Sequence, residues 1–318
     1  MTAYAITIDD IRSAHTRIGE FIHRTPIATC AKIDHQGHRS FHFKCENLQK
    51  IGAFKARGAT NAVMRLSDEE AGKGVVTHSS GNHAQALAMA ARTRGIDAHI
   101  VMPTSALAVK KNAVIEYGGI IHECEPTLAA RESLADAVMQ ETGATFIAPY
   151  NHPDVMAGQG TTAIELLEDV ENLDALVIPV GGGGLLSGMC IAAKAIQPDI
   201  RIFAAEPSGA DDAARSFAAG ELIPQTGPRT IADGLLTSLG DLTWPIIRDH
   251  IETVITVDDT QIIAAMKLVW ERMKLVIEPS AATTVAAVLS EEFMQRDGMP
   301  RVGVVLSGGN ADLGNLPW

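Results

Sequence analysis

Short aliphatic runs alternate with alanine-rich helical patterns along most of the chain, from about residue 74 to residue 306. This alternation is typical of repeated βαβ units, in which the strands lie parallel and helices cover both faces of the sheet. It predicts an α/β fold built on mostly parallel sheets.

The expected strands fall into two series. The first series predicts one compact unit, with strands at Gly74 to His78, Ala98 to Met102, Ile120 to Cys124 and Thr145 to Ala148. The second predicts another sheet, with strands at Ala175 to Val180, Arg201 to Glu206, Thr253 to Val257 and Val302 to Leu306. A chain of 318 residues suits one large or two modest domains. Because no linker separates the two series, we expect the units to share an extensive interface.

Composition excludes several classes of partner. A formal net charge of -12 and the absence of any Lys/Arg run disfavour nucleic acid and anionic membranes. No apolar stretch reaches membrane-spanning length, and the charged N-terminal segment is unlike a signal peptide. That segment, Thr7 to Phe21, opens with Thr-x-x-Asp, which predicts a capped surface helix. Four scattered cysteines encode neither a disulfide framework nor a zinc site, so a reducing, cytoplasmic location is expected.

Lys55 lies in the segment KIGAFKARGA, between glycines 52 and 58 and ahead of a helical pattern from Ala59 to Leu66. A positive helix end and the nearby Arg57 would lower the pKa of its amine, as a covalent nucleophile requires. Taken alone, a solvated surface lysine explains the pattern better.

The segment THSSGNHAQAL follows a strand and opens a helix. Its free backbone N–H groups, with Ser79, Ser80 and Asn82, suit a carboxylate or phosphate ligand. A well-capped helix with polar turn residues is an equally good explanation, and His83 on its own is better explained by packing.

Four consecutive glycines, Gly181, Gly182, Gly183 and Gly184, connect a strand to a helix. Backbone N–H groups without side chains at a helix start form an anion nest, so a phosphate is expected there. A dinucleotide-binding unit is the competing interpretation, with Glu206 as its acidic residue. Its fingerprint is imperfect, because Ser187 replaces the third Gly or Ala.

Two further strand ends carry polar groups. Glu206 is followed by Asp211 and Asp212, which suit Mg²⁺ or Ca²⁺, although helix capping by the two aspartates explains the cluster equally well. Ser307 ends the run VVLSGGNADL, where a turn could bring its hydroxyl toward a ligand.

Together and in this order, the motifs resemble the serine racemase and serine/threonine dehydratase family of pyridoxal-phosphate enzymes. The likeness covers nearly the whole chain and includes the lysine segment, SSGNH, AGQGT, the four glycines, EPSGADD, IADGL, WERMKLVIEPSA and LSGGN. It implies the two-domain architecture called fold type II, with a large domain at residues 1–70 and 150–318 and a small inserted domain at 71–149.

The resemblance also implies roles for the cofactor residues. Lys55 would bind pyridoxal phosphate covalently beside Phe54, the four glycines would hold the phosphate, Asn82 would face the ring hydroxyl and Ser307 the ring nitrogen. Because a neutral serine does not hold a pyridinium as an aspartate would, the ring is a weaker electron sink and elimination outcompetes transamination.

The substrate and cation residues follow from the same resemblance. Ser80 would handle a proton on the ring face opposite Lys55, and Ser79, Asn82 and His83 would bind the amino-acid substrate. Arg131 and Ser238 would clasp a second carboxylate, although Arg131 could equally form an interdomain ion pair. A divalent cation would be held by three residues, Glu206, Ala210 and Asp212.

The resemblance favours an ammonia-lyase that converts a small 3-hydroxy amino acid, 3-hydroxyaspartate before serine or threonine, to a 2-keto acid and ammonia. An amino-acid racemase is the alternative, and a dinucleotide-binding oxidoreductase or a non-catalytic binder is the outside possibility. A homodimer is implied, and the end at Trp318 predicts no allosteric regulatory domain.

Overall fold

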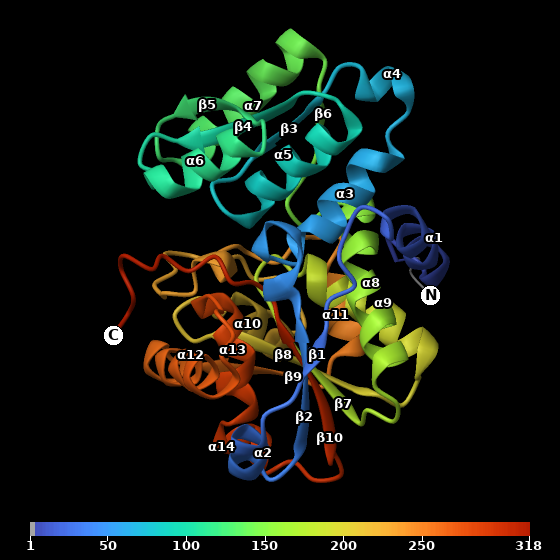
Figure 1. The fold of residues 1–318 in the computed structure, drawn as a ribbon, viewed down its shortest axis with the longest axis vertical. Helices are drawn as coiled ribbons and strands as arrows, with labels where there is room; N and C mark the ends of the chain where they lie inside the picture. Colours follow the sequence, from blue (N-terminus) through green and yellow to red (C-terminus); the bar gives the residue numbers. More distant parts are fainter. Residues whose placement is uncertain (1–3) are drawn as a thin grey trace.

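A computed structural model describes residues 4–318. They form two units, each built on one sheet, that follow one another along the long axis of the molecule (Figure 1). The larger sheet has the order β1-β2-β10-β7-β8-β9, and all neighbours are parallel except β1 and β2. Its strands are β1 (Ile27–Ala28), β2 (Ser40–Cys45), β7 (Ala175–Pro179), β8 (Arg201–Pro207), β9 (Thr253–Val257) and β10 (Arg301–Leu306).

Helices cover both faces of this sheet, which explains why its central strands are buried throughout. One face carries α1 (Ile8–Ile18), α8 (Pro153–Asp169), α9 (Gly184–Ile196), α10 (Asp212–Ala219) and α11 (Trp244–His250). The other carries α2 (Ala31–Gly37), α12 (Asp259–Met273), α13 (Pro279–Val288) and α14 (Glu291–Met294).

The smaller sheet is wholly parallel, with the order β5-β4-β3-β6. Its strands are β3 (Val75–His78), β4 (Ala98–Pro103), β5 (Ile120–Cys124) and β6 (Thr145–Phe146). Its core on one face includes residues of α3 (Lys55–Arg65), α5 (Asn82–Arg94) and α6 (Ala108–Glu116), and on the other residues of α7 (Leu128–Thr142). The short helix α4 (Asp68–Ala71) leads into it.

The α/β class and both predicted strand series are confirmed, since all eight expected strands are present within a residue or two of their expected ends. The domain boundaries stay a prediction, because α3 packs against both α5 and α8. The capped N-terminal helix is also confirmed: Thr7 and Asp10 form a reciprocal capping box ahead of α1.

Strands β1 and β2 are missing from the sequence prediction. In β2 the polar residues His42 and Lys44 alternate with Phe41 and Phe43, and Lys44 is nevertheless fully buried. Its ammonium donates to Glu165 on α8 at 2.7 Å. Phe41, Phe43 and Cys45 alternate with polar residues, so β2 has the period-two pattern of a strand, and the sequence prediction missed it.

The four cysteines are free, as expected. No helix within residues 4–318 combines the length and apolar character needed to cross a membrane.

Candidate active site

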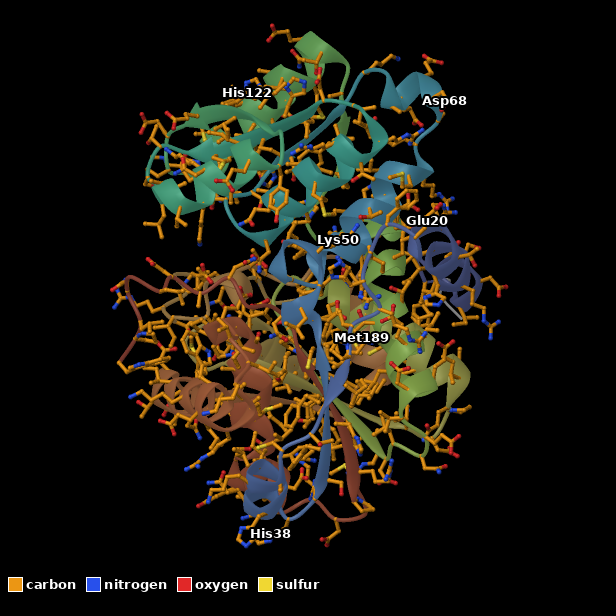
Figure 2. The ribbon with its side chains drawn as sticks, viewed as in Figure 1. Glu20, His38, Lys50, Asp68, His122 and Met189 are labelled. Atoms are coloured by element: carbon orange, nitrogen blue, oxygen red, sulfur yellow. The ribbon has the colours of Figure 1, made fainter. Side chains whose placement is uncertain are left out.

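The predicted cofactor residues lie where the two sheets meet. The turn η2 (Lys50–Gly52), which leads to Lys55, lies at this junction, where Figure 2 labels Lys50. Phe54 donates its backbone N–H to the carbonyl of Ser307 at 3.0 Å, so the lysine segment and the end of β10 are adjacent. A fold of parallel strands places ligands beyond their carboxyl ends, and this junction is such a place.

Lys55 is the first residue of α3, which therefore begins four residues earlier than expected. Its Nζ donates to the carbonyl of Pro149 at 2.6 Å and lies 5.2 Å from the centroid of the Phe54 ring. Burial lowers the pKa of the amine from 10.5 to about 8. The direction agrees with the sequence analysis, but the expected cause was wrong, because Arg57 points into a buried ion-pair network instead.

The SSGNH turn joins β3 to α5 beside Lys55. The Ser79 hydroxyl accepts from the N–H of Gly81 at 3.4 Å, whereas the Ser80 side chain forms no hydrogen bond within residues 4–318. His83 is buried, with Nε2 3.0 Å from the carbonyl of Ile147. Burial and, to a smaller extent, the charge of Lys55 lower the pKa of His83 to about 3, so its imidazole is neutral.

Asn82 links the two sheets through a group that the sequence analysis left without a role, Glu278. Its Nδ2 donates to Oε1 of Glu278 at 3.0 Å, and its Oδ1 accepts from Nδ2 of Asn310 at 2.7 Å. Asn310 also donates its backbone N–H to Glu278 at 3.1 Å. The amide of Asn82 is thus fixed by Asn310 on its oxygen and by both carboxylate oxygens of Glu278, at 3.0 and 3.3 Å, on its nitrogen. Glu278 lies in the motif WERMKLVIEPSA, directly before Pro279 at the start of α13, but no role was predicted for this residue.

Burial raises the pKa of Glu278 to about 7. The charge of Asp233 also raises this pKa. Hydrogen bonds from Asn82 and Asn310, together with the charge of Lys110, act in the opposite direction and lower it. The carboxylate therefore titrates near neutral pH within contact of a predicted cofactor ligand.

The four glycines form a tight loop between β7 and α9. A Cβ on Gly182 would lie 2.3 Å from the Tyr150 ring, and Gly183 has a φ of 86°, in the left-handed region. Side chains are therefore excluded from this loop, and its N–H groups at the start of α9 suit a phosphate. Tyr150 had no signal in the sequence, because its contact with the loop is formed only in the folded chain.

Ser307 is buried at the end of β10. The following residue, Gly308, pairs with Ala53 in an isolated bridge and leaves no room for a side chain beside Glu278. Lys55, Asn82 and Ser307 are thus connected to one another through direct neighbours.

Arg131 and Ser238, the residues expected to clasp a second carboxylate, have separate partners in this conformation. The Nε of Arg131 donates to the Thr127 carbonyl in its own helix at 3.3 Å, and the Ser238 hydroxyl accepts from the N–H of Gln225 at 2.9 Å. Arg131 forms no ion pair with any acid in residues 4–318, so the interdomain ion pair is absent from this conformation.

Glu206, at the end of β8, and Asp212, at the start of α10, are both buried carboxylates. Both oxygens of Glu206 accept N–H groups at the start of α10, from Ala213 and Ala214, each at 2.9 Å. Glu206 therefore caps this helix, and the capping role predicted as an alternative for Asp211 and Asp212 is wrong, since neither caps it with a side chain.

Burial raises the pKa of Glu206 to about 8 and that of Asp212 to about 6. Oδ2 of Asp212 accepts from Leu239 at 2.9 Å, but its buried Oδ1 has no partner within residues 4–318. Buried carboxylates and an unpartnered oxygen fit a hard cation, with Ala210 in the same turn. No cluster of three or more His, Cys, Asp or Glu side chains able to hold a metal occurs in the described chain.

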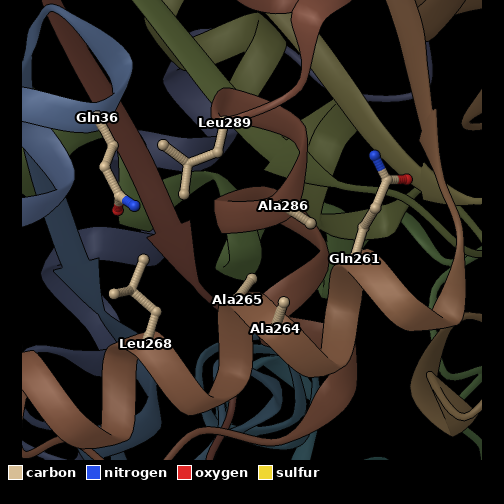
Figure 3. A pocket seen from close by; sticks show the side chains of 7 residues that line it. All are labelled: Gln36, Gln261, Ala264, Ala265, Leu268, Ala286 and Leu289. Carbon is tan, nitrogen blue, oxygen red and sulfur yellow. The ribbon is translucent and has the colours of Figure 1, made fainter.

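A separate groove lies on the far side of the larger sheet, between α2, α12 and the end of α13 (Figure 3). None of its lining side chains is titratable or nucleophilic; they are Gln36, Gln261, Ala264, Ala265, Leu268, Ala286 and Leu289. The candidate residues do not line this groove, so it takes no part in the chemistry of the junction.

Comparisons with known proteins identify the family to which this chain belongs. The family model described as "Pyridoxal-phosphate dependent enzyme" matches residues 18–308. A serine racemase of Dictyostelium discoideum is 51% identical over 313 residues, covering 98% of this chain and 97% of that protein. A beta-hydroxyaspartate dehydratase of Paracoccus denitrificans (strain Pd 1222) is 50% identical over 317 residues, covering 99% of each.

Among solved structures, that of maize serine racemase has a TM-score of 0.97 and 51% identity, covering 98% of this chain and 95% of that one. These similarities overturn the dinucleotide-binding alternative for the glycine loop. The chain belongs to the family of pyridoxal-phosphate-dependent enzymes.

Proposed function

We propose that this chain is an amino-acid racemase that acts on serine or a closely related amino acid, with β-elimination of water as a competing reaction. The sequence motifs favoured elimination as the main reaction; we place racemisation first because the chain is similar to serine racemases over nearly its full length. The observation that carries the proposal is the adjacency of Lys55, with its lowered pKa, to the SSGNH turn.

Racemisation needs two proton-handling groups on opposite sides of Cα, whereas elimination needs one group to remove the Cα proton and a proton donor for the leaving hydroxyl. An amine with a pKa of about 8 exists in both protonation states near neutral pH, so Lys55 can remove or return the Cα proton. The hydroxyl of Ser80 is not engaged with other side chains, and we assign it the proton on the second side. Return of the proton on that side inverts the substrate.

Other residues would hold the cofactor. Gly181 to Gly184 would bind its phosphate, Asn82 its ring oxygen and Ser307 its ring nitrogen, with Phe54 beside it. When bound, pyridoxal phosphate supplies an aldehyde for the substrate amine and a ring that draws electrons from Cα. Ser79, with Asn82 and His83, would bind the substrate carboxylate at the start of α5.

Product analysis tests the proposal. The holoprotein is incubated with L-serine, D-serine, L-threonine and the stereoisomers of 3-hydroxyaspartate, and chiral chromatography is combined with assays for keto acid and ammonia. We expect interconversion of L- and D-serine together with slower release of keto acid. Release of keto acid and ammonia without any change of enantiomer would make the protein a lyase and reject the racemase.

Two variants test the assigned roles. Lys55→Ala should lose both reactions, and borohydride should fix the cofactor to a wild-type peptide that contains Lys55. Ser80→Ala should suppress racemisation by about 10²- to 10⁴-fold, the range of general acid–base contributions, while the cofactor still binds. Racemisation that persists in Ser80→Ala would remove this residue from the reaction.

Dehydration of 3-hydroxyaspartate is the second candidate, favoured by the Paracoccus relative. In this case Arg131 and Ser238 would bind the distal carboxylate after the two sheets approach each other. Arg131→Ala should then lose far more activity on 3-hydroxyaspartate than on serine, whereas Arg92→Ala, on helix α5 at the other face of the smaller sheet, should affect both equally. Equal losses from Arg131→Ala would defeat the assignment.

We further assign a divalent cation, Mg²⁺ or Ca²⁺, to Glu206, Ala210 and Asp212, with a stabilising rather than chemical role. The protein is proposed to act as a homodimer in the cytoplasm. Sedimentation equilibrium of the holoprotein, giving either one or two times the chain mass of 33.7 kDa, tests the dimer.

A further inference from the structure

One ion pair joins the two sheets on the side away from the chain connection. Nζ of Lys110, on α6 of the smaller sheet, lies 2.6 Å from Oδ2 of Asp233, the first residue of η3 (Asp233–Leu235). The other ion pairs between residues 71–149 and the rest of the described chain, Lys73–Glu69 and Arg94–Asp68, lie beside α4. In Figure 1 α6 and α4 are at opposite sides of the upper unit, and Figure 2 labels Asp68 on the α4 side.

Asp233 belongs to η3, which packs against the proposed phosphate loop. A Cβ on Gly181 would lie 3.0 Å from the Cα of Leu235, so η3 rests directly on the four glycines. The backbone N–H of Gly234 also donates to the hydroxyl of Ser280 at 2.9 Å, which ties η3 to the start of α13. The position of Asp233 is therefore fixed relative to the proposed cofactor site.

Lys110 is linked to the proposed substrate turn through the packing of α6 on α5. Helix α6 packs on α5 through the buried Val114, and α5 begins with Asn82. Lys110 and Asp233 both lie close enough to act electrostatically on the buried Glu278, which accepts a hydrogen bond from Asn82. The ion pair is therefore close to the Asn82–Glu278 contact, which joins the substrate turn to the larger-sheet unit.

We infer that Lys110 and Asp233 are a positioning pair, which holds the unit that carries the SSGNH turn at a fixed distance from η3 and the glycine loop and so aligns the groups that bind the substrate. This inference rests on the proposed function for its substrate. The pair touches neither reacting group, so its loss should weaken substrate binding and leave the chemical step intact. It adds a contact across the junction to those that Asn82 forms with Glu278 and Asn310.

The size of the effect is limited by solvent. The Lys110 side chain is 29% exposed and that of Asp233 53%, and half-exposed pairs contribute little. We expect a rise in KM of about fivefold at most, from the usual range for such pairs. Because salt screens exposed charges, the wild-type KM should rise with ionic strength and that of the variants should not.

Lys111 is a matched control. It is the next residue on α6 and pairs with Glu123 at 2.6 Å, within the smaller sheet unit. Lys110→Met and Asp233→Asn should each raise KM for L-serine with kcat unchanged, whereas Lys111→Met should change neither. The double variant Lys110→Asp with Asp233→Lys should restore KM toward the wild-type value.

Hydrogen exchange provides a readout that needs no turnover. In the holoprotein, amides of residues 79–82 and 233–235 should exchange faster in Lys110→Met and Asp233→Asn than in Lys111→Met or the wild type. If the two variants exchange faster but the wild type turns over none of the tested amino acids, the positioning role is supported and the proposed function is rejected. Unchanged exchange and KM in both single variants, or equal effects from Lys111→Met, would overturn the pair.

Discussion

Lys55 and Arg57 are two residues apart on α3 and have opposite electrostatic surroundings. The amine of Lys55 is buried next to a single carbonyl, and burial lowers its pKa to about 8. The guanidinium of Arg57 is also buried but forms paired hydrogen bonds with Glu46 and Glu165, which raise its pKa despite burial. Local sequence places the two cations together, and their partners make one reactive and the other structural.

The lowered pKa of Lys55 should control how fast the apoprotein takes up its cofactor. Only the neutral amine attacks an aldehyde, so the rate should rise about tenfold per pH unit below the pKa of Lys55 and level off above it. With a pKa of about 8 the plateau should begin near that pH, whereas an ordinary lysine would delay it to about 10.5. The absorbance of the bound cofactor measures the rate. A free lysine derivative is the control, and a rate still rising steeply at high pH would contradict the lowered pKa.

At the scale of elements, the loop between β7 and α9 and the turn between β8 and α10 are short segments at neighbouring strand ends. The first is shaped by the Tyr150 ring against Gly182. The second is shaped by Glu206, at the end of β8, which accepts N–H groups at the start of α10, and by Leu239, which donates to Asp212. Each combines a local sequence signal with a contact from elsewhere in the chain.

The glycine loop yields a double-mutant prediction. Gly182→Ala forces a Cβ into the Tyr150 ring and should cost about 1–3 kcal/mol of unfolding free energy, with weaker cofactor binding. Urea unfolding and cofactor titration measure the two effects. In a Tyr150→Ala background the clash is relieved, so the same substitution should cost much less. An identical cost in both backgrounds would show that the ring does not restrict this loop.

The turn after β8 yields a pH-dependent cation effect. Glu206 has a raised pKa of about 8, so its contribution to stability is complete below its ordinary value of 4.5 and is lost as pH rises through about 8. A divalent cation requires ionised carboxylates and should offset this loss. Adding Mg²⁺ or Ca²⁺ should therefore raise Tm more at pH 8 than at pH 6.

Two variants separate this site from general charge effects. Glu206→Gln should abolish the increase in Tm on adding the cation. Asp211→Asn should retain it, because Asp211 is paired with Arg215 and its side chain is 43% exposed. An equal increase in the Glu206 variant would reject the cation site.

At the scale of the whole molecule, a buried ionic cluster joins β2, η1 (Glu46–Leu48), α3 and α8 beneath the candidate site. Arg57 contacts Glu46 at 2.8 Å and Glu165 at 2.7 Å, and Lys44 contacts Glu165 at 2.7 Å. Burial alone would raise the pKa of Glu165, but Arg57 and Lys44 lower it to about 2. The cluster orients the helix that starts at Lys55.

Removal of one member should leave uncompensated buried charge. Arg57→Met is expected to lower the free energy of unfolding by about 3–5 kcal/mol in urea titrations. Arg65→Met is the matched control on the same helix, because its pair with Asp154 is half exposed and should cost less than about 1 kcal/mol. Similar losses of unfolding free energy in the two variants would show that the buried cluster stabilises the fold no more than a half-exposed ion pair does.

Much of the fold was predictable because its signals are local. Apolar runs such as Ala175–Pro179 identify central parallel strands, Thr7 and Asp10 identify a helix start, and four glycines identify a loop without side chains. Strand β2 was missed although Phe41 and Phe43 alternate with polar residues; its local sequence does not show that Lys44 is buried, because that burial depends on Glu165 and the Thr25 carbonyl. Glu278 and Tyr150 were missed for the same reason: each acts on a motif that is remote from it in the sequence.

By itself, the sequence determined the α/β class, the family and the positions of the lysine and glycine motifs, because periodicity, backbone geometry and residue order are properties of neighbouring residues. Only the tertiary structure decided which charges are buried together, why the Lys55 amine has a low pKa, and that Lys110 faces Asp233. The physical reason is that desolvation and Coulomb energy depend on distances between residues remote in the chain, and those distances exist only after folding.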